Sequence, residues 1–415
     1  MSRTTGVAES LAGWAERFEA DDEDLALADR ALLDTVSVGL AARDQPILSI
    51  VTSLPEVARW AVACHILDFD DLHLPSTTHI STVCVPAALA SGGGPRAYLA
   101  GAGVMARLGT ALGWEHYSRG WHATTTAGAL GAAVTAAVAA DAPADVIAAA
   151  MSLAVPAAGG VQRAFGTDAK SIQVGLAVDA GRRAAGLALA GATADPRAVD
   201  EWLRLLGGRP DRVEATDSAR PAVPDGLAIK IYPCCYALQR PISALLEAGA
   251  TSLDPAALRR IVVRTPAGTV APLVHHRPQT GLEGKFSLEY AVAATLLDGQ
   301  TGFASFTDEA VRRPAAQRLV QLVEVELSDG GDGLLSGRVE IELHSAGTST
   351  VCDLRLPPGA PQRPPTGPEL ARKLEDCLSG TGLDPAAITW DSAAALLHHH
   401  LPPTAPATSS PTSPT

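Results

Sequence analysis

Aromatic residues are scarce in this chain of 415 residues, at 4% of the total. Apolar residues of all kinds still make up 47%, and many are alanines that stand in long runs with other small residues. Small side chains allow helix backbones to pack closely together. The sequence therefore predicts a large core of tightly packed helices, and its length suits two domains better than one.

Basic residues are in the minority, with 32 lysines and arginines against 45 aspartates and glutamates and a net charge of −13. So acidic a chain is poorly suited to bind nucleic acid or an anionic membrane. Uncharged runs such as residues 123–140 contain Ala, Thr and Gly rather than Leu and Ile, which favours a packed core helix over a membrane span. We expect neither nucleic acid nor membrane as a partner, and an anionic substrate would need local cations in a pocket.

The six cysteines include no CxxC pair, and the adjacent Cys234 and Cys235 could hardly bridge each other without strain. Buried thiols in a reducing cytosol are the simplest interpretation. The sequence shows no Cys–His pairing that would indicate a nucleophilic cysteine. Apolar packing is therefore favoured for both Cys234 and Cys235. The N-terminal residues turn acidic too early for a secretory signal peptide. We expect a cytoplasmic protein.

Helical patterns dominate the first half of the chain. They cover residues 8–43, 54–67, 98–112, 118–140, 143–155 and 171 onward. Around residues 207–228 the composition changes to Gly, Pro, Asp and Arg, which indicates a domain boundary. Strand-like patterns follow at 260–265, 321–327 and 338–344, mixed with helical segments at 241–248, 288–297 and 308–311.

The expected fold class is mainly α, with a large all-helical domain and a smaller α+β domain. We expect four segments. They are an all-helical domain at 1–225, an α+β domain at 226–365, C-terminal helices at 366–401 that return to the helical domain, and a disordered tail at 402–415. The tail, mostly Pro, Ser and Thr, lacks the apolar content needed to fold.

The densest group of reactive side chains lies in residues 66–89, ILDFDDLHLPSTTHISTVCVPAAL, between two helical patterns. Its candidate groups are Asp68, Asp70, Asp71, His73 and His79. Such a loop suits proton transfer, because imidazole titrates near neutral pH. Asp70 and Asp71 could simply cap a helix or pair with arginines, which we favour for them, and His73 is expected to be structural or at a pocket rim. The spacing fits no standard metal-ligand pattern, so no metal is expected.

Six segments in order resemble the MmgE/PrpD family, which includes 2-methylcitrate dehydratase, cis-aconitate decarboxylase and iminodisuccinate epimerase. They are ALLDTVSVGLA, LDFDDLH with the later His79, GWHATTTAGALGAA, GTDAKSIQVG, KIYPCCYALQRPIS and GLEGKFSLEYAVAATLLDG. Each is weak alone, but six in order over nearly the whole chain are specific. The resemblance implies a pocket between a helical domain and an α+β lid, usually in a homodimer, with no metal or organic cofactor.

Carried over position by position, the resemblance also implies a set of site residues. The implied catalytic residues are His79, His122 and Asp68, and the implied substrate-binding residues are Lys170, Lys230, Tyr290 and Gln173. Family chemistry makes or breaks a bond next to a carboxylate, so it needs a base, an acid and cations that hold the carboxylates. One histidine would remove the α-proton, the other would act as the acid, and the lysines would hold carboxylates. Taken alone, His122 could also be an ordinary core histidine and Lys230 a surface lysine.

The expected function is that of a cofactor-independent lyase acting on a small polycarboxylate or hydroxy acid, with dehydration favoured, as in 2-methylcitrate dehydratase. Decarboxylation and epimerisation are alternatives, because they share the same carbanionic intermediate. A non-catalytic relative that binds a carboxylate is a further alternative, and the retained histidines and lysines argue against it. The chain departs from the family at Leu72, Ile80, Gln173 and Leu238-Gln239, which indicates a substrate unlike methylcitrate.

Overall fold

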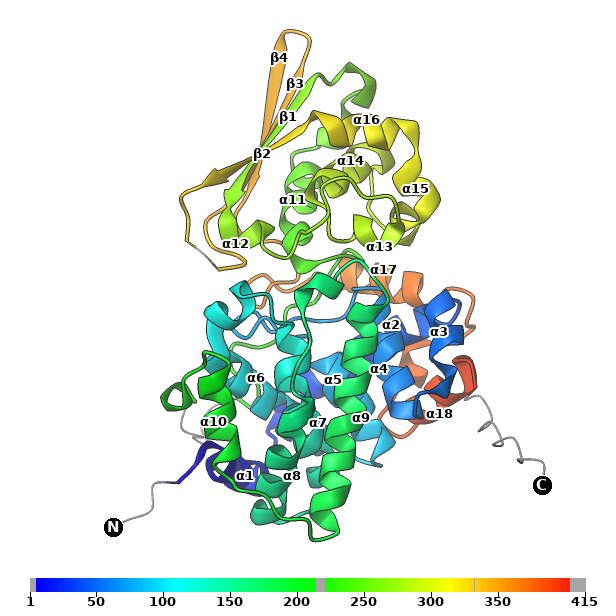
Figure 1. Cartoon of the computed structure of the whole chain (residues 1–415). Helices are drawn as coiled ribbons and strands as arrows, with labels where there is room; N and C mark the ends of the chain where they lie inside the picture. Colours follow the sequence, from blue (N-terminus) through cyan, green and yellow to red (C-terminus); the bar gives the residue numbers. More distant parts are fainter. Residues whose placement is uncertain (1–4, 214–220, 332, 404–415) are drawn as a thin grey trace, which may run out of the picture.

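The structure is a computed structural model that describes residues 5–213, 221–331 and 333–403. Figure 1 shows a larger helical part below a smaller part that contains a four-stranded sheet. We call the larger part the helical body and the smaller part, residues 228–354, the sheet module. The chain is thus mainly α-helical with one small mixed sheet, as the sequence predicts.

The helical body consists of two groups of helices that are far apart in the sequence. The first group is α1 Val7–Arg17, α2 Asp22–Ala41, α3 Pro46–Ile50, α4 Glu56–Ile66, α5 Ser81–Ala90, α6 Pro95–Ser118, α7 Ala123–Ala139, α8 Ala144–Ala154, α9 Ala169–Leu189 and α10 Ala198–Leu205. The second group is α17 Gly367–Leu378 and α18 Ala393–His400, and both of its helices pack against α2. The sequence predicts this return of the C-terminal helices.

Helix α7 lies at the centre of the helical body, where it packs against α6, α8 and α9 (Figure 1). Its small residues permit the close approach that the sequence predicts. A Cβ atom on Gly181 of α9 would overlap the Ala129 carbonyl of α7, and one on Gly101 of α6 would overlap the Thr135 hydroxyl. Glycine is therefore required where these helices cross.

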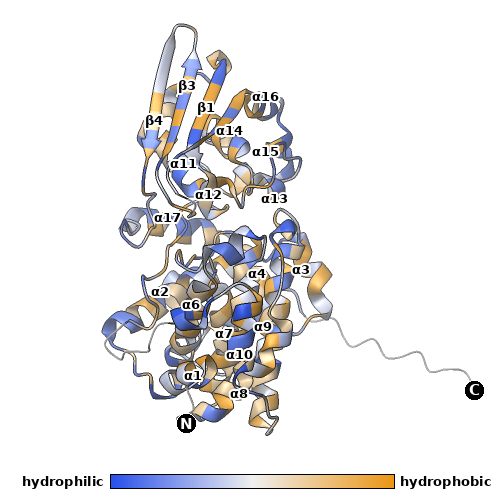
Figure 2. Cartoon of the chain, turned by 60° about the vertical axis from the view of Figure 1, so that its left-hand side comes forward, coloured by the Kyte–Doolittle hydropathy of each residue, from blue (hydrophilic) through white to orange (hydrophobic). Residues whose placement is uncertain are grey.

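The sheet module combines a four-stranded sheet with six helices. Its elements are α11 Tyr236–Glu247, β1 Arg260–Pro266, α12 Ala267–Val270, α13 Gly281–Gly284, α14 Leu288–Asp298, α15 Asp308–Arg312, α16 Pro314–Leu322, β2 Val323–Ser328, β3 Val339–Ser345 and β4 Thr348–Leu354. The strand order is β2-β1-β3-β4, with β1 and β2 parallel and the other pairs antiparallel. Buried and partly buried residues alternate along β3, because one face of the sheet is covered, whereas most residues of β1 are buried (Figure 2).

Several elements differ from the sequence prediction, and three of the differences have a local reason. The helical pattern at 8–43 is two helices, because Asp21 caps the start of α2 by accepting from the Asp24 N–H. Helix α11 begins at Tyr236 and contains Pro241 in its interior rather than at its start. Strand β4 was not predicted, since the polar residues of TSTVCDL hide its alternation.

Buried hydrophobic residues form two clusters. The first lies in the helical body and includes Cys377 of α17 and Leu397 of α18. The second fills the sheet module and also contains Leu72 and Phe165, which come from loops of the helical body. The boundaries expected at residues 225 and 365 stay predictions. Residues 214–220 of the expected linker, and the expected tail from residue 404 onward, lie outside the described residues.

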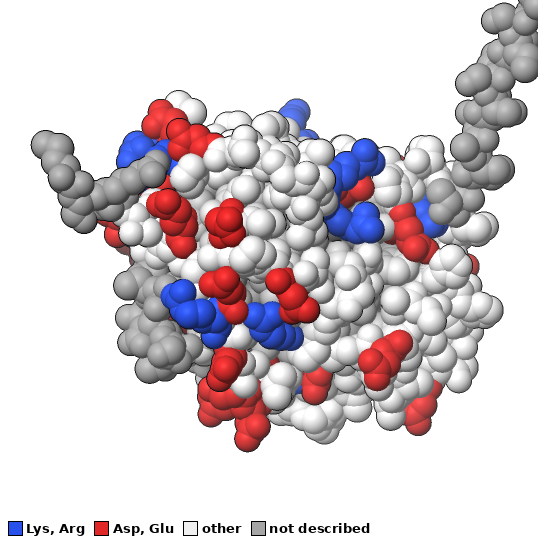
Figure 3. All heavy atoms as spheres, turned by 90° about the horizontal axis from the view of Figure 1, so that it is seen from below, with Lys and Arg blue, Asp and Glu red and all other residues white. Residues whose placement is uncertain are grey.

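Among the described residues, no helix is both long and apolar enough to span a bilayer. All six cysteines are buried and unpaired, as the simplest interpretation of the sequence predicts. On the face of the helical body seen in Figure 3, basic side chains lie next to acidic ones and form no extended basic area.

Candidate active site

Four of the predicted site residues line one cavity where the helical body meets the sheet module. Asp68 and His79 come from the loop after α4, His122 precedes α7, and Lys170 lies in the first turn of α9. The free space at the centre of this site cavity is only about 20 Å³, enough for about one water molecule. The side chains that the resemblance groups together thus converge in space.

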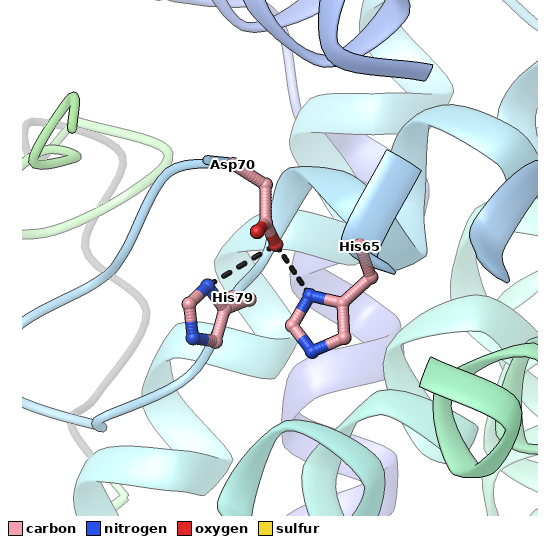
Figure 4. Close-up of side chains that lie close together, drawn as sticks. All are labelled: His65, Asp70 and His79. Atoms are coloured by element: carbon pink, nitrogen blue, oxygen red, sulfur yellow. Dashed lines mark hydrogen bonds and ion pairs between the residues drawn. The ribbon is translucent and has the colours of Figure 1, made fainter. Parts of the chain in front are cut away.

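His65 and His79 share one carboxylate (Figure 4). The Asp70 Oδ2 atom lies 2.7 Å from His65 Nδ1 and 3.1 Å from His79 Nδ1, and the two imidazole rings are 4.8 Å apart. The Asp70 side chain is fully buried. Asp70 therefore belongs to the site, and the expectation that it caps a helix or pairs with an arginine is wrong.

The partners of each imidazole decide which nitrogen carries the proton. His79 Nδ1 lies 2.7 Å from the carbonyl oxygen of Asp71, which can only accept, so His79 Nδ1 is protonated. His65 Nε2 accepts from the Lys170 ammonium at 2.7 Å, so in His65 it is again Nδ1 that donates to Asp70. In neutral His79, the lone pair is then on Nε2, which makes no hydrogen bond with any described residue.

Burial keeps these histidines neutral. It lowers the pKa of His65 to about 4, although Asp70 acts in the opposite direction. Burial likewise lowers the pKa of His79 below its ordinary value of 6.5, again against the pull of Asp70. Burial alone would raise the pKa of Asp70, but the two imidazoles hold it well below its usual range. The Asp70 carboxylate therefore stays ionised and orients both rings.

Asp68 binds both predicted lysines. Its Oδ1 atom accepts from Lys170 Nζ at 3.0 Å and from Lys230 Nζ at 2.9 Å, and Lys230 also donates to the Asp68 carbonyl at 2.8 Å. Burial would raise the pKa of Asp68, but the two ammonium groups hold it far below its usual range. Its Oδ2 atom is buried without a partner among the described residues, so one acceptor remains for a ligand.

His122 is the least satisfied polar side chain of the site. It is 2% exposed, and neither ring nitrogen has a hydrogen-bond partner among the described residues. Burial and the nearby Lys170 lower its pKa well below 6.5. Its ring lies 6.0 Å from that of His65 and 5.1 Å from that of Phe165. Leaving buried nitrogens unpaired is costly, which indicates that a bound molecule supplies the missing partner.

The sequence carries no expectation for two further residues, His65 and Lys285. His65 lies in the last turn of α4, the helix that leads into the acidic loop, and it precedes Asp70 by five residues. This closeness in the sequence was the only available signal. Lys285 donates to the carbonyl oxygens of Leu67 and Pro233, and with Lys170 it lines a small cavity next to the site cavity. Burial lowers the pKa of Lys285 to about 8.

The structure does not bring Tyr290 and Gln173 into the site cavity. Tyr290 is fully buried in the sheet module, where its hydroxyl donates to the Ser305 carbonyl. Gln173 uses its side-chain oxygen to accept from the Val161 N–H at 2.6 Å. Both side chains are therefore engaged in local structure, and their implied substrate-binding role finds no support in this geometry.

The other polar residues of the acidic loop have structural partners. His73 accepts from Ser76 and donates to the Pro224 carbonyl, as expected of a structural residue. Asp71 accepts from the backbone and the hydroxyl of Ser81, the first residue of α5, so it does act as a cap. Burial raises the pKa of Asp71 to about 7.

The residues His65, Asp70 and His79 could in principle hold a metal ion, since their ligand atoms lie within 4.8 Å of one another. A divalent cation bound to both Nδ1 atoms would have to displace two protons and break the bond to the Asp71 carbonyl. It would also lie close to Lys170, which repels it. The geometry therefore fits a hydrogen-bonded proton-transfer group better than a metal centre.

Two protein-family models match the chain and together cover most of the helical body and the sheet module. The model described as the MmgE/PrpD N-terminal domain matches residues 55–203, and that described as the MmgE/PrpD C-terminal domain matches residues 232–391. The search of curated proteins finds no match to the chain. The two family models meet in the site, since the first contains Asp68, His79, His122 and Lys170 and the second contains Lys285.

Proposed function

Because the chain belongs to the MmgE/PrpD family of dehydratase- and lyase-like enzymes, we propose that it is a lyase. In this proposal it removes a proton next to the carboxylate of a small acid and expels a β-hydroxyl group as water. The free Nε2 atom of His79 is the observation that carries the proposal. The homodimer implied by the resemblance stays a prediction, and so does the cytoplasmic location expected from the cysteines and the N-terminal residues.

His79 is the proposed base. Its Nδ1 proton is bound by the Asp71 carbonyl and lies 3.1 Å from the Asp70 carboxylate, so a positive charge formed on the ring is stabilised. A buried base with a lowered pKa is unprotonated at neutral pH, as proton abstraction requires. His65 is a positioning residue, because it fixes Asp70 from the opposite side.

His122 and Lys170 are the proposed groups for the developing negative charge. Neutral His122 has one N–H with no partner among the described residues, and this N–H can hydrogen-bond to the leaving hydroxyl or to a carboxylate oxygen. The proton that turns the leaving hydroxyl into water comes from the His79 imidazolium, which holds the proton taken from carbon. Lys170 carries an ammonium that can hold the substrate carboxylate. The unpartnered Oδ2 atom of Asp68 can accept from the substrate hydroxyl. Asp68 would then bind and orient the substrate, since its low pKa rules it out as an acid at neutral pH.

Proton NMR in heavy water tests this proposal on a panel of hydroxy acids and unsaturated acids. The expected result is deuterium at the α-carbon together with an alkene signal. The variant His79→Gln should lower the exchange rate by roughly 10²–10⁴-fold, the usual contribution of general base catalysis. His73→Gln is the matched control, because it removes a buried histidine of the same loop that does not line the site cavity.

Each outcome of the experiment has a definite meaning. Unchanged exchange in His79→Gln, with His73→Gln also active, would remove His79 as the base. Exchange with no alkene would favour epimerisation, and release of carbon dioxide would favour decarboxylation. Binding of acids without any exchange would favour a non-catalytic carboxylate-binding protein.

A further inference from the structure

The charges around the site cavity nearly cancel before any substrate binds. Lys170, Lys230 and Lys285 supply three positive charges, and Asp68 and Asp70 supply two negative ones. The histidines are neutral in the hydrogen-bonding pattern described above. A buried charge needs a partner, so this balance leaves one positive charge for a substrate.

Within the described residues, the lining of the site cavity offers no second lysine or arginine beside Lys170. Among the described residues, no arginine lines the site cavity or the small cavity next to it. Lys230 uses its ammonium on two oxygen atoms of Asp68, and Lys285 uses its own on two backbone carbonyls. Lys170 also has two partners, His65 Nε2 and Asp68 Oδ1, but it is the one lysine that lines the site cavity within the described part of the chain, and its ammonium has a third proton to donate.

Two positions near the site point in the same direction. Leu72 lines the site cavity with an apolar side chain. Gln239 faces away from the cavity, because its amide clamps the loop before α11 through the backbone of Ile231, Tyr232 and Cys234. Neither position offers a donor to a second carboxylate.

The lining of the site cavity includes five apolar side chains. We call these side chains together the Leu72 wall. It consists of Leu72, Phe165, Pro272, Phe286 and Leu334. The Phe165 and Phe286 rings are 5.2 Å apart, and the Lys170 ammonium lies 5.5 Å from the centre of each. A carboxylate on Lys170 therefore has hydrocarbon surface directly beside it.

We propose that the substrate is a monocarboxylic hydroxy acid whose apolar substituent packs against the Leu72 wall. A second or third carboxylate would face this wall without a cation and would lose its hydration. This inference rests on the proposed function, and it departs from the polycarboxylate expected from the sequence.

A matched series of 3-hydroxy acids tests the proposal. All members keep the same reacting carbons, and only the group on the hydroxyl-bearing carbon changes from carboxylate, as in malate, to methyl, propyl or phenyl. The expected kcat/KM rises roughly three- to fourfold for each methylene group buried, with malate lowest. A preference for malate or citrate over every monocarboxylate would overturn the proposal.

The variant Leu72→Thr replaces an apolar side chain of the Leu72 wall with a smaller, polar one. It should reduce the ratio of kcat/KM for the propyl compound over malate by about tenfold, since one apolar contact surface is lost. Leu74→Thr is the control, because this partly buried leucine of the same loop does not line the site cavity. An unchanged ratio in Leu72→Thr would remove the Leu72 wall as the specificity element.

Calorimetric binding of unreactive analogues separates this inference from the proposed function. Hexanoate and 3-phenylpropanoate are compared with succinate and tricarballylate. Tighter binding of the monocarboxylates without turnover of any hydroxy acid would support the inference and contradict the lyase. Turnover restricted to di- or tricarboxylates would support the lyase and contradict the inference.

Discussion

At the scale of single residues, a backbone carbonyl decides which nitrogen of His79 can act on a substrate. The Asp71 carbonyl takes the Nδ1 proton, so only Nε2 can remove a proton from carbon. The sequence predicts His79 as a site residue, but it does not predict which ring nitrogen carries the proton. The position of the Asp71 carbonyl, which decides this, depends on how the loop folds. His65 and Lys285 were missed for the same reason, since their partners lie on other segments.

The pH dependence of kcat/KM follows from two lowered pKa values. The base His79 must be neutral, and because burial lowers its pKa below 6.5, activity should persist on the acid side of that value. Lys285 must be charged, and its pKa of about 8 should make activity fall above that pH. A profile measured from pH 5 to 10 checks both limbs. In Lys285→Arg the alkaline fall should disappear, because arginine stays protonated.

Asp71 makes the stability of the fold depend on pH. Its pKa rises from 3.8 to about 7 in the folded protein because it is buried. The unfolded chain therefore releases this proton first, so Asp71 lowers the free energy of unfolding as pH rises from about 4 to about 7, by up to a few kcal/mol. Asp71→Asn should flatten this slope in urea denaturation. The exposed Asp141→Asn is the control and should leave the slope unchanged.

At the scale of elements, helix α17 anchors both α2 and the acidic loop through one lysine. Lys373 forms a buried ion pair of 2.6 Å with Asp34 of α2 and donates to the Phe69 carbonyl at 2.8 Å. Phe69 lies between two aspartates of the site. The sequence predicts both helices from their periodicity, but not this pair, because 339 positions separate the two residues and no local pattern links them.

Lys373→Met should lower the free energy of unfolding by about 3–5 kcal/mol, because Asp34 is then a buried charge without a partner. The double variant Asp34→Leu/Lys373→Met should regain most of that loss, since it removes both charges. Urea denaturation measures both variants. Equal stability of the single and double variants would show that the buried charge is not the cause.

Strand prediction succeeded where the hydrophobic alternation was strong. The predicted ranges of β1, β2 and β3 come close to the observed bounds. The order of the strands, β2-β1-β3-β4, is known only from the folded sheet. Both edge strands, β2 and β4, are mostly exposed, so burial does not impose alternation on either of them. The sequence VEVELS of β2 alternates nevertheless, whereas TSTVCDL of β4 is mostly polar and carries no readable signal.

At the scale of the whole molecule, the site cavity lies where the helical body meets the sheet module. Their contact includes a hydrogen bond of 3.0 Å from His275 of the sheet module to the Phe165 carbonyl. The next residue, Gly166, has a φ of 81°, and an added Cβ atom would overlap the His275 ring. This glycine therefore permits the two parts to close together.

Gly166→Ala should hold the two parts apart and raise KM more than it lowers kcat. The left-handed backbone costs about 1–2 kcal/mol for alanine, and the overlap adds to that. Removing the overlap in Gly166→Ala/His275→Ala should recover part of the affinity. Steady-state kinetics check both variants, and a lower kcat with unchanged KM would contradict this role for Gly166.

The position of α17 also has a consequence for biosynthesis. The sheet module is inserted between two parts of the helical body. The start of the module meets the segment that follows it where the Ile229 N–H donates to the Gly359 carbonyl at 2.8 Å. Lys373 follows this module in the sequence, whereas its partner Asp34 precedes it. Because synthesis proceeds from the N-terminus, the ribosome must complete the whole inserted module before Asp34 can be neutralised. A nascent chain that stalls before α17 would keep an unpaired carboxylate in its first long helix, so the last helices made decide whether the first ones stay folded.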